Sequence, residues 1–184
     1  MGIARKTTRA GIISALYTTL CQKIVILQWL ARCAVPLPSS SNIFPNNNRM
    51  KILVINCGSS SIKYKLYEMD DQSVLAAGGI EKIGLEGAFL KTKINGETKI
   101  IESPCPTHTE GIKLMFDTLL NPEYGAIKSL DEISAAGHRI VAGGRFTQSQ
   151  IVTPEMLEEW HQYMELAPLH SPAHLKGYEA VRAM

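Results

Sequence analysis

The pattern of apolar and polar positions after residue 50 predicts strands first and helices later. Lys51–Asn56 (KILVIN) is a short, β-branched apolar run, which is typical of a buried strand. A small polar stretch follows, and then Ile62, Tyr64 and Leu66 alternate with lysines, as in a half-buried strand. Two such strands with a short turn between them predict a hairpin.

Two glycine-containing stretches give further strand signals. Val74–Ile83 predicts a third strand, broken at Gly78-Gly79. Phe89–Ile94 and Lys99–Ile101 flank Asn95-Gly96, and both of these turn residues tolerate a positive φ. The second stretch therefore predicts another hairpin.

Helix start signals appear in the second half of the chain. Thr107–Glu110 has the S/T-x-x-E spacing of a capping box, and apolar residues then recur at near-helical spacing up to Asn121-Pro122. Ile133–Val141 predicts one more strand. Thr153-Pro154 and Ser171-Pro172 begin two more helices, with proline in the first turn. Strands followed by helices, without an internal repeat, favour an α/β or α+β domain.

Residues 1–49 differ in character from the rest. They hold six of the 19 Lys and Arg and none of the 17 Asp and Glu, which leaves residues 50–184 with a net charge of −4. The segment is Arg-rich and free of acids, as in an organelle transit peptide. Lys23 and Arg32 interrupt its apolar stretches, which argues against a secretory signal, and no run approaches the roughly 20 apolar residues of a membrane span. We favour an upstream in-frame extension, disordered or not native, with the working protein starting at Met50, over a transit peptide.

The remaining composition narrows the class of protein. A mildly acidic body without a basic stripe argues against nucleic-acid binding. The four cysteines (Cys21, Cys33, Cys57 and Cys105) form no CxxC pair, so neither a zinc site nor a disulfide framework is indicated. A reducing cytoplasm is the expected compartment.

The strongest local signal for chemistry is Asn56–Lys63 (NCGSSSIK). A glycine permits a tight turn after a buried strand, and small residues expose backbone N–H groups. Three hydroxyls and Lys63 add donors and a positive charge, which suits an anion such as a nucleotide phosphate. The spacing differs from a Walker loop, and an ordinary polar hairpin turn is the alternative. Cys57 has no evident partner base, and we interpret it as a small buried residue.

Two more segments place polar groups beside rigid turns. In Gly137–Gly144, Arg139 can present its planar fork to a carboxylate or phosphate, although a surface ion pair is the commoner fate of an arginine. His138 fits a structural histidine better than a catalyst. In Leu166–Pro172, two prolines could hold the residues between them rigidly, or the segment could simply connect two helices.

Taken together and in order, these three segments resemble acetate kinase. Lys51–Lys63 matches KILVINCGSSSxK, Gly137–Gly144 matches GHRxVxGG, and Leu166–Pro172 matches LAPLHNP with Ser171 in place of asparagine. The resemblance spans essentially all of residues 50–184, and three motifs in order at the expected spacing are highly specific.

The resemblance implies an α/β fold. It would be the first, incomplete lobe of the two-lobe, ribonuclease H-like fold of sugar kinases, actin and heat-shock chaperones, with nucleotide bound between the lobes. It also implies a Mg²⁺-dependent, reversible transfer, ATP + acetate to ADP + acetyl phosphate, by a cytoplasmic homodimer. Propionate remains an alternative acceptor, because each extra methylene is worth only about 1–3 kcal/mol of discrimination.

Four residues of the first motif receive roles by this resemblance. Asn56 would help to place the magnesium ion. Ser59, Ser61 and Lys63 would contact phosphates of the nucleotide or of the transferring group. These roles agree with the chemistry, since phosphoryl transfer depends chiefly on positioning and on stabilising charge at the equatorial oxygens.

The other two motifs would supply the acceptor side of the site. Arg139 would bind the acetate carboxylate or the phosphoryl group. Val141 and Leu169 would line a pocket for the methyl group, and His170 would support the site beside that pocket. The catalytic aspartate of the family would lie beyond Met184, so the resemblance places no catalytic group within this chain.

Two hypotheses follow. In the first, the chain is a fragment of an acetate kinase that is inactive alone, and the lack of a C-cap signal on its last helix favours this. In the second, it is an independent binding or regulatory module derived from the same lobe. The second needs a self-sufficient core and a capped end.

Overall fold

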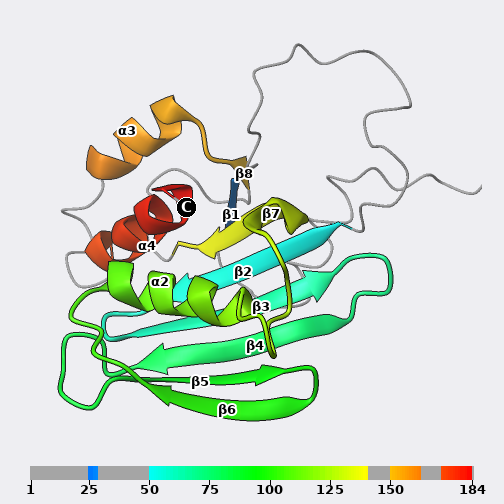
Figure 1. The fold of residues 1–184 in the computed structure, drawn as a ribbon. Coiled ribbons are helices and arrows are strands. Elements are labelled where there is room, and N and C mark those ends of the chain that lie inside the picture. Colours follow the sequence, from blue (N-terminus) through cyan, green and yellow to red (C-terminus); the bar gives the residue numbers. More distant parts are fainter. Residues whose placement is uncertain (1–24, 29–49, 141–149, 163–170, 184) are drawn as a thin grey trace, which may run out of the picture.

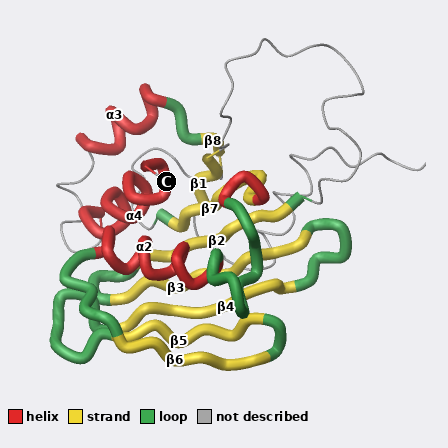
Figure 2. Tube along the Cα trace, in the orientation of Figure 1, coloured by secondary structure: helices red, strands yellow, loops and turns green. Residues whose placement is uncertain are grey.

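A computed structural model describes residues 25–28, 50–140, 150–162 and 171–183. Its strands form one eight-stranded sheet in the order β6-β5-β4-β3-β2-β7-β1-β8. Helices α2 and α4 contact each other, and both pack against one face of this sheet (Figures 1 and 2). The predicted α/β class is confirmed.

The first predicted hairpin is confirmed. β2 (Lys51–Cys57) and β3 (Ser61–Glu68) pair antiparallel along their whole length, with Cys57 opposite Ile62 at the turn. The apolar residues on one side of each strand are buried in the main core beneath the helices. Because side chains alternate across a strand, the intervening residues, which include Lys63 and Lys65, lie on the opposite face.

The predicted break in the third strand is wrong. β4 (Val74–Glu81) continues through both glycines and pairs with β3 and with β5. A Cβ atom on Gly78 would lie 2.6 Å from the Lys91 carbonyl oxygen, and one on Gly79 would lie 3.1 Å from that of Ile62. These glycines allow close approach of neighbouring backbone and do not end the strand.

The second predicted hairpin is also confirmed. β5 (Phe89–Ile94) and β6 (Glu97–Glu102) are joined by Asn95 and Gly96, whose φ angles are 52° and 87°. Both turn residues are in the left-handed region, as a tight two-residue hairpin requires.

Helix α2 (His108–Leu119) begins as predicted. The Thr107 hydroxyl accepts from the backbone N–H of Thr109, and the Glu110 carboxylate accepts from the backbone N–H of Thr107. These bonds satisfy N–H groups that the first helical turn leaves without partners. The apolar face of the helix packs against β3 and β4. Its buried residues include Ile112, Met115, Phe116 and Leu119.

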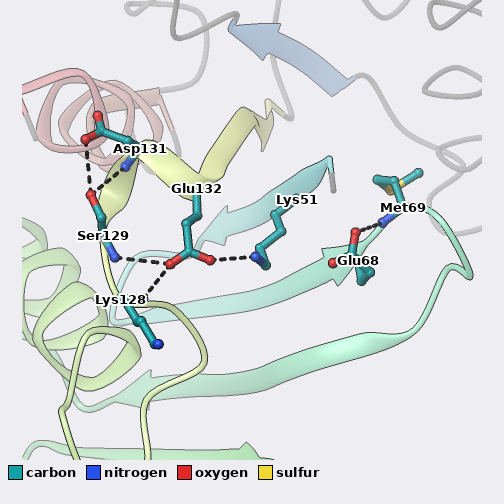
Figure 3. Close-up of polar contacts among 7 residues, drawn as sticks. All are labelled: Lys51, Glu68, Met69, Lys128, Ser129, Asp131 and Glu132. Atoms are coloured by element: carbon teal, nitrogen blue, oxygen red, sulfur yellow. Dashed lines mark hydrogen bonds and ion pairs between the residues drawn. The ribbon is translucent and has the colours of Figure 1, made fainter. Parts of the chain in front are cut away.

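Strand β7 (Ile133–Arg139) lies parallel to β2 and follows a 3₁₀ turn at Leu130–Glu132. The Glu132 carboxylate accepts from Lys51 Nζ at 2.6 Å and from the backbone N–H of Lys128 at 2.6 Å (Figure 3). Burial alone would raise the pKa of this carboxyl, but these hydrogen bonds and the Lys51 charge lower it below its usual value. The ion pair thus ties together the starts of two neighbouring strands.

Two short strands extend the sheet beyond β7. β1 (Val25–Gln28) pairs antiparallel with β7, and β8 (Gln150–Ile151) pairs parallel with β1. We predicted no element within residues 1–49, and β1 is one. The division of the chain at Met50 stays a prediction.

The two C-terminal helices occur where proline signals predicted them. They are α3 (Pro154–Gln162) and α4 (Ser171–Ala183). Trp160 and Tyr178 meet edge to face between them, with ring centroids 6.2 Å apart. This contact belongs to a second apolar cluster that also contains Ile140, Met156 and Leu175. Within the described residues, no helix is long and apolar enough to cross a membrane.

Candidate functional site

Three predicted site residues lie in one row across three neighbouring strands. Asn56 on β2 pairs with Lys63 on β3. Arg139 ends β7, one residue after His138, which pairs with Ile55 of β2. All three side chains line one cavity of about 650 Å³. Ile55 and the residues two positions away on either side, Leu53 and Cys57, are buried beneath the helices. The row therefore lies on the sheet face opposite α2 and α4, because successive side chains of a strand point to opposite faces.

The cavity is electropositive. Its charged lining residues are five cations and one carboxylate, namely Lys63, Lys65, Lys91, Lys93, Arg139 and Glu81. A concave surface lined mainly by one sign of charge raises the local concentration of the opposite ion. The cavity therefore suits an anionic ligand.

Arg139 has a donor that lacks an acceptor. Its Nε is buried and makes no hydrogen bond within the described part of the chain. A buried donor without a partner costs about 1–3 kcal/mol, so an acceptor at this position would be stabilising. The guanidinium fork matches the two oxygens of a carboxylate or a phosphate.

The turn between β2 and β3 lies next to this row. Ser59 and Ser60 are exposed at its tip, and the Gly58 N–H donates to the Ser61 carbonyl at 2.7 Å. A strand follows the turn, so it is not a helix N-terminus of the Walker kind. Its hydroxyls and backbone N–H groups are the donors available to an anion here.

The interior beneath the turn is apolar in character, although it contains a thiol and imidazoles. Cys57 is fully buried, and burial raises the pKa of its thiol to about 12, which confirms that it is a small buried residue. Burial likewise lowers the pKa of His138 to about 4. The described residues contain no group of three or more His, Cys, Asp or Glu that could hold a metal ion. Neither Cys57 nor His138 is charged at neutral pH, so neither supplies charge to a ligand at this position.

The sequence-predicted residues divide into two sets. The structure brings Asn56, Lys63 and Arg139 together, with the serines of the turn beside them. Val141, Leu169 and His170 lie outside the described residues.

One polar contact of the turn was not foreseen. His108 Nε2 lies 2.7 Å from the Gly58 carbonyl oxygen, across 50 residues of sequence. No role was predicted for His108 from the sequence. The available signal was the capping box, which places His108 at the first helical position after Thr107.

Comparisons with known proteins show the family of the chain. The sequence profile of the acetokinase family matches residues 51–184. The chain belongs to the acetokinase family. It is 58% identical to the acetate kinase of Bacteroides thetaiotaomicron and 60% identical to that of Phocaeicola vulgatus, in each case over 137 residues. The match covers 73% of this chain and 34% of each relative, so the chain spans about a third of their length.

Solved structures of the family show the same fold. Porphyromonas gingivalis acetate kinase superposes with a TM-score of 0.69 at 48% identity, and a propionate kinase from Francisella tularensis with 0.62 at 28%. Each match covers 73% of this chain and 34% of the other. The expected kinship with one lobe of the acetate and propionate kinases is confirmed.

Proposed function

We propose that this chain supplies the phosphate-binding and acceptor-binding lobe of an acetate kinase. The complete protein would transfer a phosphoryl group from ATP to acetate, giving ADP and acetyl phosphate, and would run the reverse reaction too. The observation that supports this best is the row of Arg139, Asn56 and Lys63 along one electropositive cavity. In-line phosphoryl transfer needs this kind of preorganised positive charge more than it needs a nucleophile on the protein.

Lys63 and the serine turn form the nucleotide side of the proposal. The Lys63 side chain is exposed and can move its ammonium group to follow a phosphate. Ser59 and Ser61 add hydroxyl donors within two to four residues of it along the chain. Together they would hold oxygens of the γ-phosphate or of the transferring group.

Arg139 forms the acceptor side. Its unpartnered Nε gives it a free donor toward a carboxylate or a phosphoryl oxygen. The proposed roles of Val141 and Leu169 as lining of the methyl pocket, and of His170 beside it, follow from their positions in the family motifs.

Asn56 would contribute to the Mg²⁺ site. Its side chain lies between Lys63 and Arg139 in the row, which places an amide oxygen beside the proposed phosphates. Mg²⁺ usually takes one or two protein ligands and completes its shell with water and phosphate oxygens, so a single amide fits such a site. The ion would neutralise charge on the transferring phosphate, and Asn56 would orient its shell.

The 184-residue polypeptide alone should not complete the reaction, because the matched relatives are about three times as long as the stretch they share with it. We further propose a cytoplasmic location and a homodimeric complete protein. A hydroxamate assay of the polypeptide with MgATP, acetate and hydroxylamine should give no acetyl hydroxamate. Robust formation of this product would contradict the inactivity of the isolated lobe.

Binding of MgATP tests the site itself. Lys63→Gln should weaken binding about tenfold, in line with the loss of one charge-assisted hydrogen bond. Lys65→Gln is the matched control, because Lys65 lies two residues along the same strand on the same face. Equal effects of the two substitutions would show only non-specific attraction to a basic surface and would sink the assignment.

Two alternatives to this function predict different experimental results. The likeness to a propionate kinase favours propionate as a second acceptor, which a comparison of both acids in the complete protein would detect. The second alternative is a non-catalytic module derived from the same lobe. It would bind MgATP as the 184-residue chain alone, and binding would be its function.

A further inference from the structure

We propose that His108 is a positioning residue for the serine turn. It would hold the Gly58 carbonyl toward α2, so that the next backbone N–H, that of Ser59, points toward the anion-binding face. This inference rests on the proposed function, since it assumes that the turn binds phosphate oxygens.

The first step is the direction of the hydrogen bond. His108 Nε2 lies 2.7 Å from the Gly58 carbonyl oxygen, and the histidine side chain is buried. A carbonyl oxygen only accepts, so Nε2 must carry the proton and donate. The bond therefore fixes the ring tautomer and holds the Gly58 carbonyl on the helix side of the sheet.

The second step follows from the peptide plane. The described residues contain no cis peptide bond. In a trans peptide the C=O and the following N–H point in opposite directions. With the Gly58 carbonyl directed toward α2, the Ser59 N–H is directed away from it. That is the side on which Asn56, Lys63 and Arg139 line the cavity.

The third step is the rigidity of the support. Helix α2 lies close to the sheet, since a Cβ on Gly111 would be 2.9 Å from Ile62 Cδ1. The capping box fixes the first helical turn, where His108 sits. A second carbonyl of the turn, that of Ser60, accepts from the Ile83 N–H at 2.9 Å. Two carbonyls of the turn are thus held from outside it, which leaves its tip little freedom to rotate its peptides.

The variants separate this role from simple packing. His108→Leu removes the donor and keeps a side chain of comparable bulk. His108→Gln keeps an N–H donor near the position of Nε2. His161→Leu is the matched control, because His161 is exposed on α3 and its Nδ1 bonds to the Leu157 carbonyl of its own helix.

The experiment is a pyrophosphate titration of the ¹⁵N-labelled 184-residue chain, followed by amide NMR. Wild type should show shifts at Ser59, Ser61 and Lys63. His108→Leu should bind about tenfold more weakly, as expected from one misaligned backbone donor to an anion, and its Ser59 amide should relax as a mobile group even without ligand. His108→Gln and His161→Leu should behave like wild type in both measurements.

The outcomes distinguish the inference from the proposed function. If wild type does not bind pyrophosphate at the turn, the proposed phosphate site is wrong, and the mobility of the free Ser59 amide still decides whether His108 orders the turn. If wild type binds but His108→Leu matches it in affinity and Ser59 mobility, the positioning role is overturned. Loss of binding in His108→Gln as well as His108→Leu, with amide spectra unchanged elsewhere, would also overturn it, because donation would then not matter.

Discussion

Gly177 on α4 offers a test of how closely this helix must approach the strands that carry the site. A Cβ at this position would lie 2.8 Å from His138 Nε2 and 3.3 Å from Cys57 Cβ, and closer still to Cys57 Sγ. Contacts under about 3 Å at a Cβ force something to move. His138 of β7 is followed by Arg139, and Cys57 of β2 is preceded by Asn56; both of these neighbours lie on the opposite face of the sheet.

The expected effect of Gly177→Ala is the balance of two terms. Alanine in a helix interior is favoured over glycine by about 1 kcal/mol. Overpacking a filled core costs about 1–3 kcal/mol, and the upper part of that range applies because a ring and a short side chain cannot turn away. The net loss should be about 2 kcal/mol, which lowers the melting temperature of a chain of this size by about 4–8 °C.

Thermal and urea denaturation of the purified chain provide the assay. Gly111→Ala is the matched control, because its new Cβ would meet mainly the flexible tip of Ile62 at 2.9 Å, and the loss should be smaller. The double variant Cys57→Ala/Gly177→Ala should regain part of the stability. A more stable Gly177→Ala protein would refute the close packing of α4 on these strands, since the higher helix propensity of alanine would then outweigh any cost of overpacking.

Three further predictions concern groups with shifted pKa values. Burial lowers the pKa of His138 to about 4 from 6.5, so the unfolded chain takes up the proton first. The free energy of unfolding should therefore fall by up to roughly 3 kcal/mol between pH 6.5 and pH 4; urea titrations measure this, and a His138→Met variant should lose that part of the slope. The buried Cys57 thiol, with its pKa raised to about 12, should resist iodoacetamide at pH 8 in the native chain and react in urea, as mass spectrometry of the peptides would show; labelling in the native chain would contradict its burial. Lys51→Met should lower stability by about 1 kcal/mol at pH 7. Because the pKa of Glu132 is lowered in the folded state from 4.5, this difference should disappear as the pH falls below that value, and a constant difference would argue against the ion pair.

The local signals in the sequence predicted most of the fold. The Asn95-Gly96 turn and the Thr107 capping box are decided by interactions within a few residues, and both formed as expected. The predicted strand break at Gly78-Gly79 was wrong, because a glycine in a strand has two possible meanings. Whether a glycine ends a strand or admits a close neighbour depends on a strand distant in sequence, here β5.

The candidate site shows the same division. Its motif residues could be named from the order and spacing of three segments. The pairing of Asn56 with Lys63 was not predicted, because it depends on the register of β2 and β3. The approach of His108 to Gly58 could not be predicted, because it depends on where α2 crosses the sheet. The close fit of Gly177 against β2 and β7 likewise arises only when helix and sheet are packed together.

The central claim is that this lobe carries a working half of an acetate kinase site. A chimera tests it most directly: residues 51–184 replace the corresponding stretch of the Bacteroides thetaiotaomicron acetate kinase, to which the chain is 58% identical. We predict acetyl phosphate formation from ATP and acetate, lost on Arg139→Gln and retained on Arg182→Gln, an exposed arginine of α4. A folded chimera that forms no acetyl phosphate, or one that is indifferent to Arg139→Gln, would contradict the account.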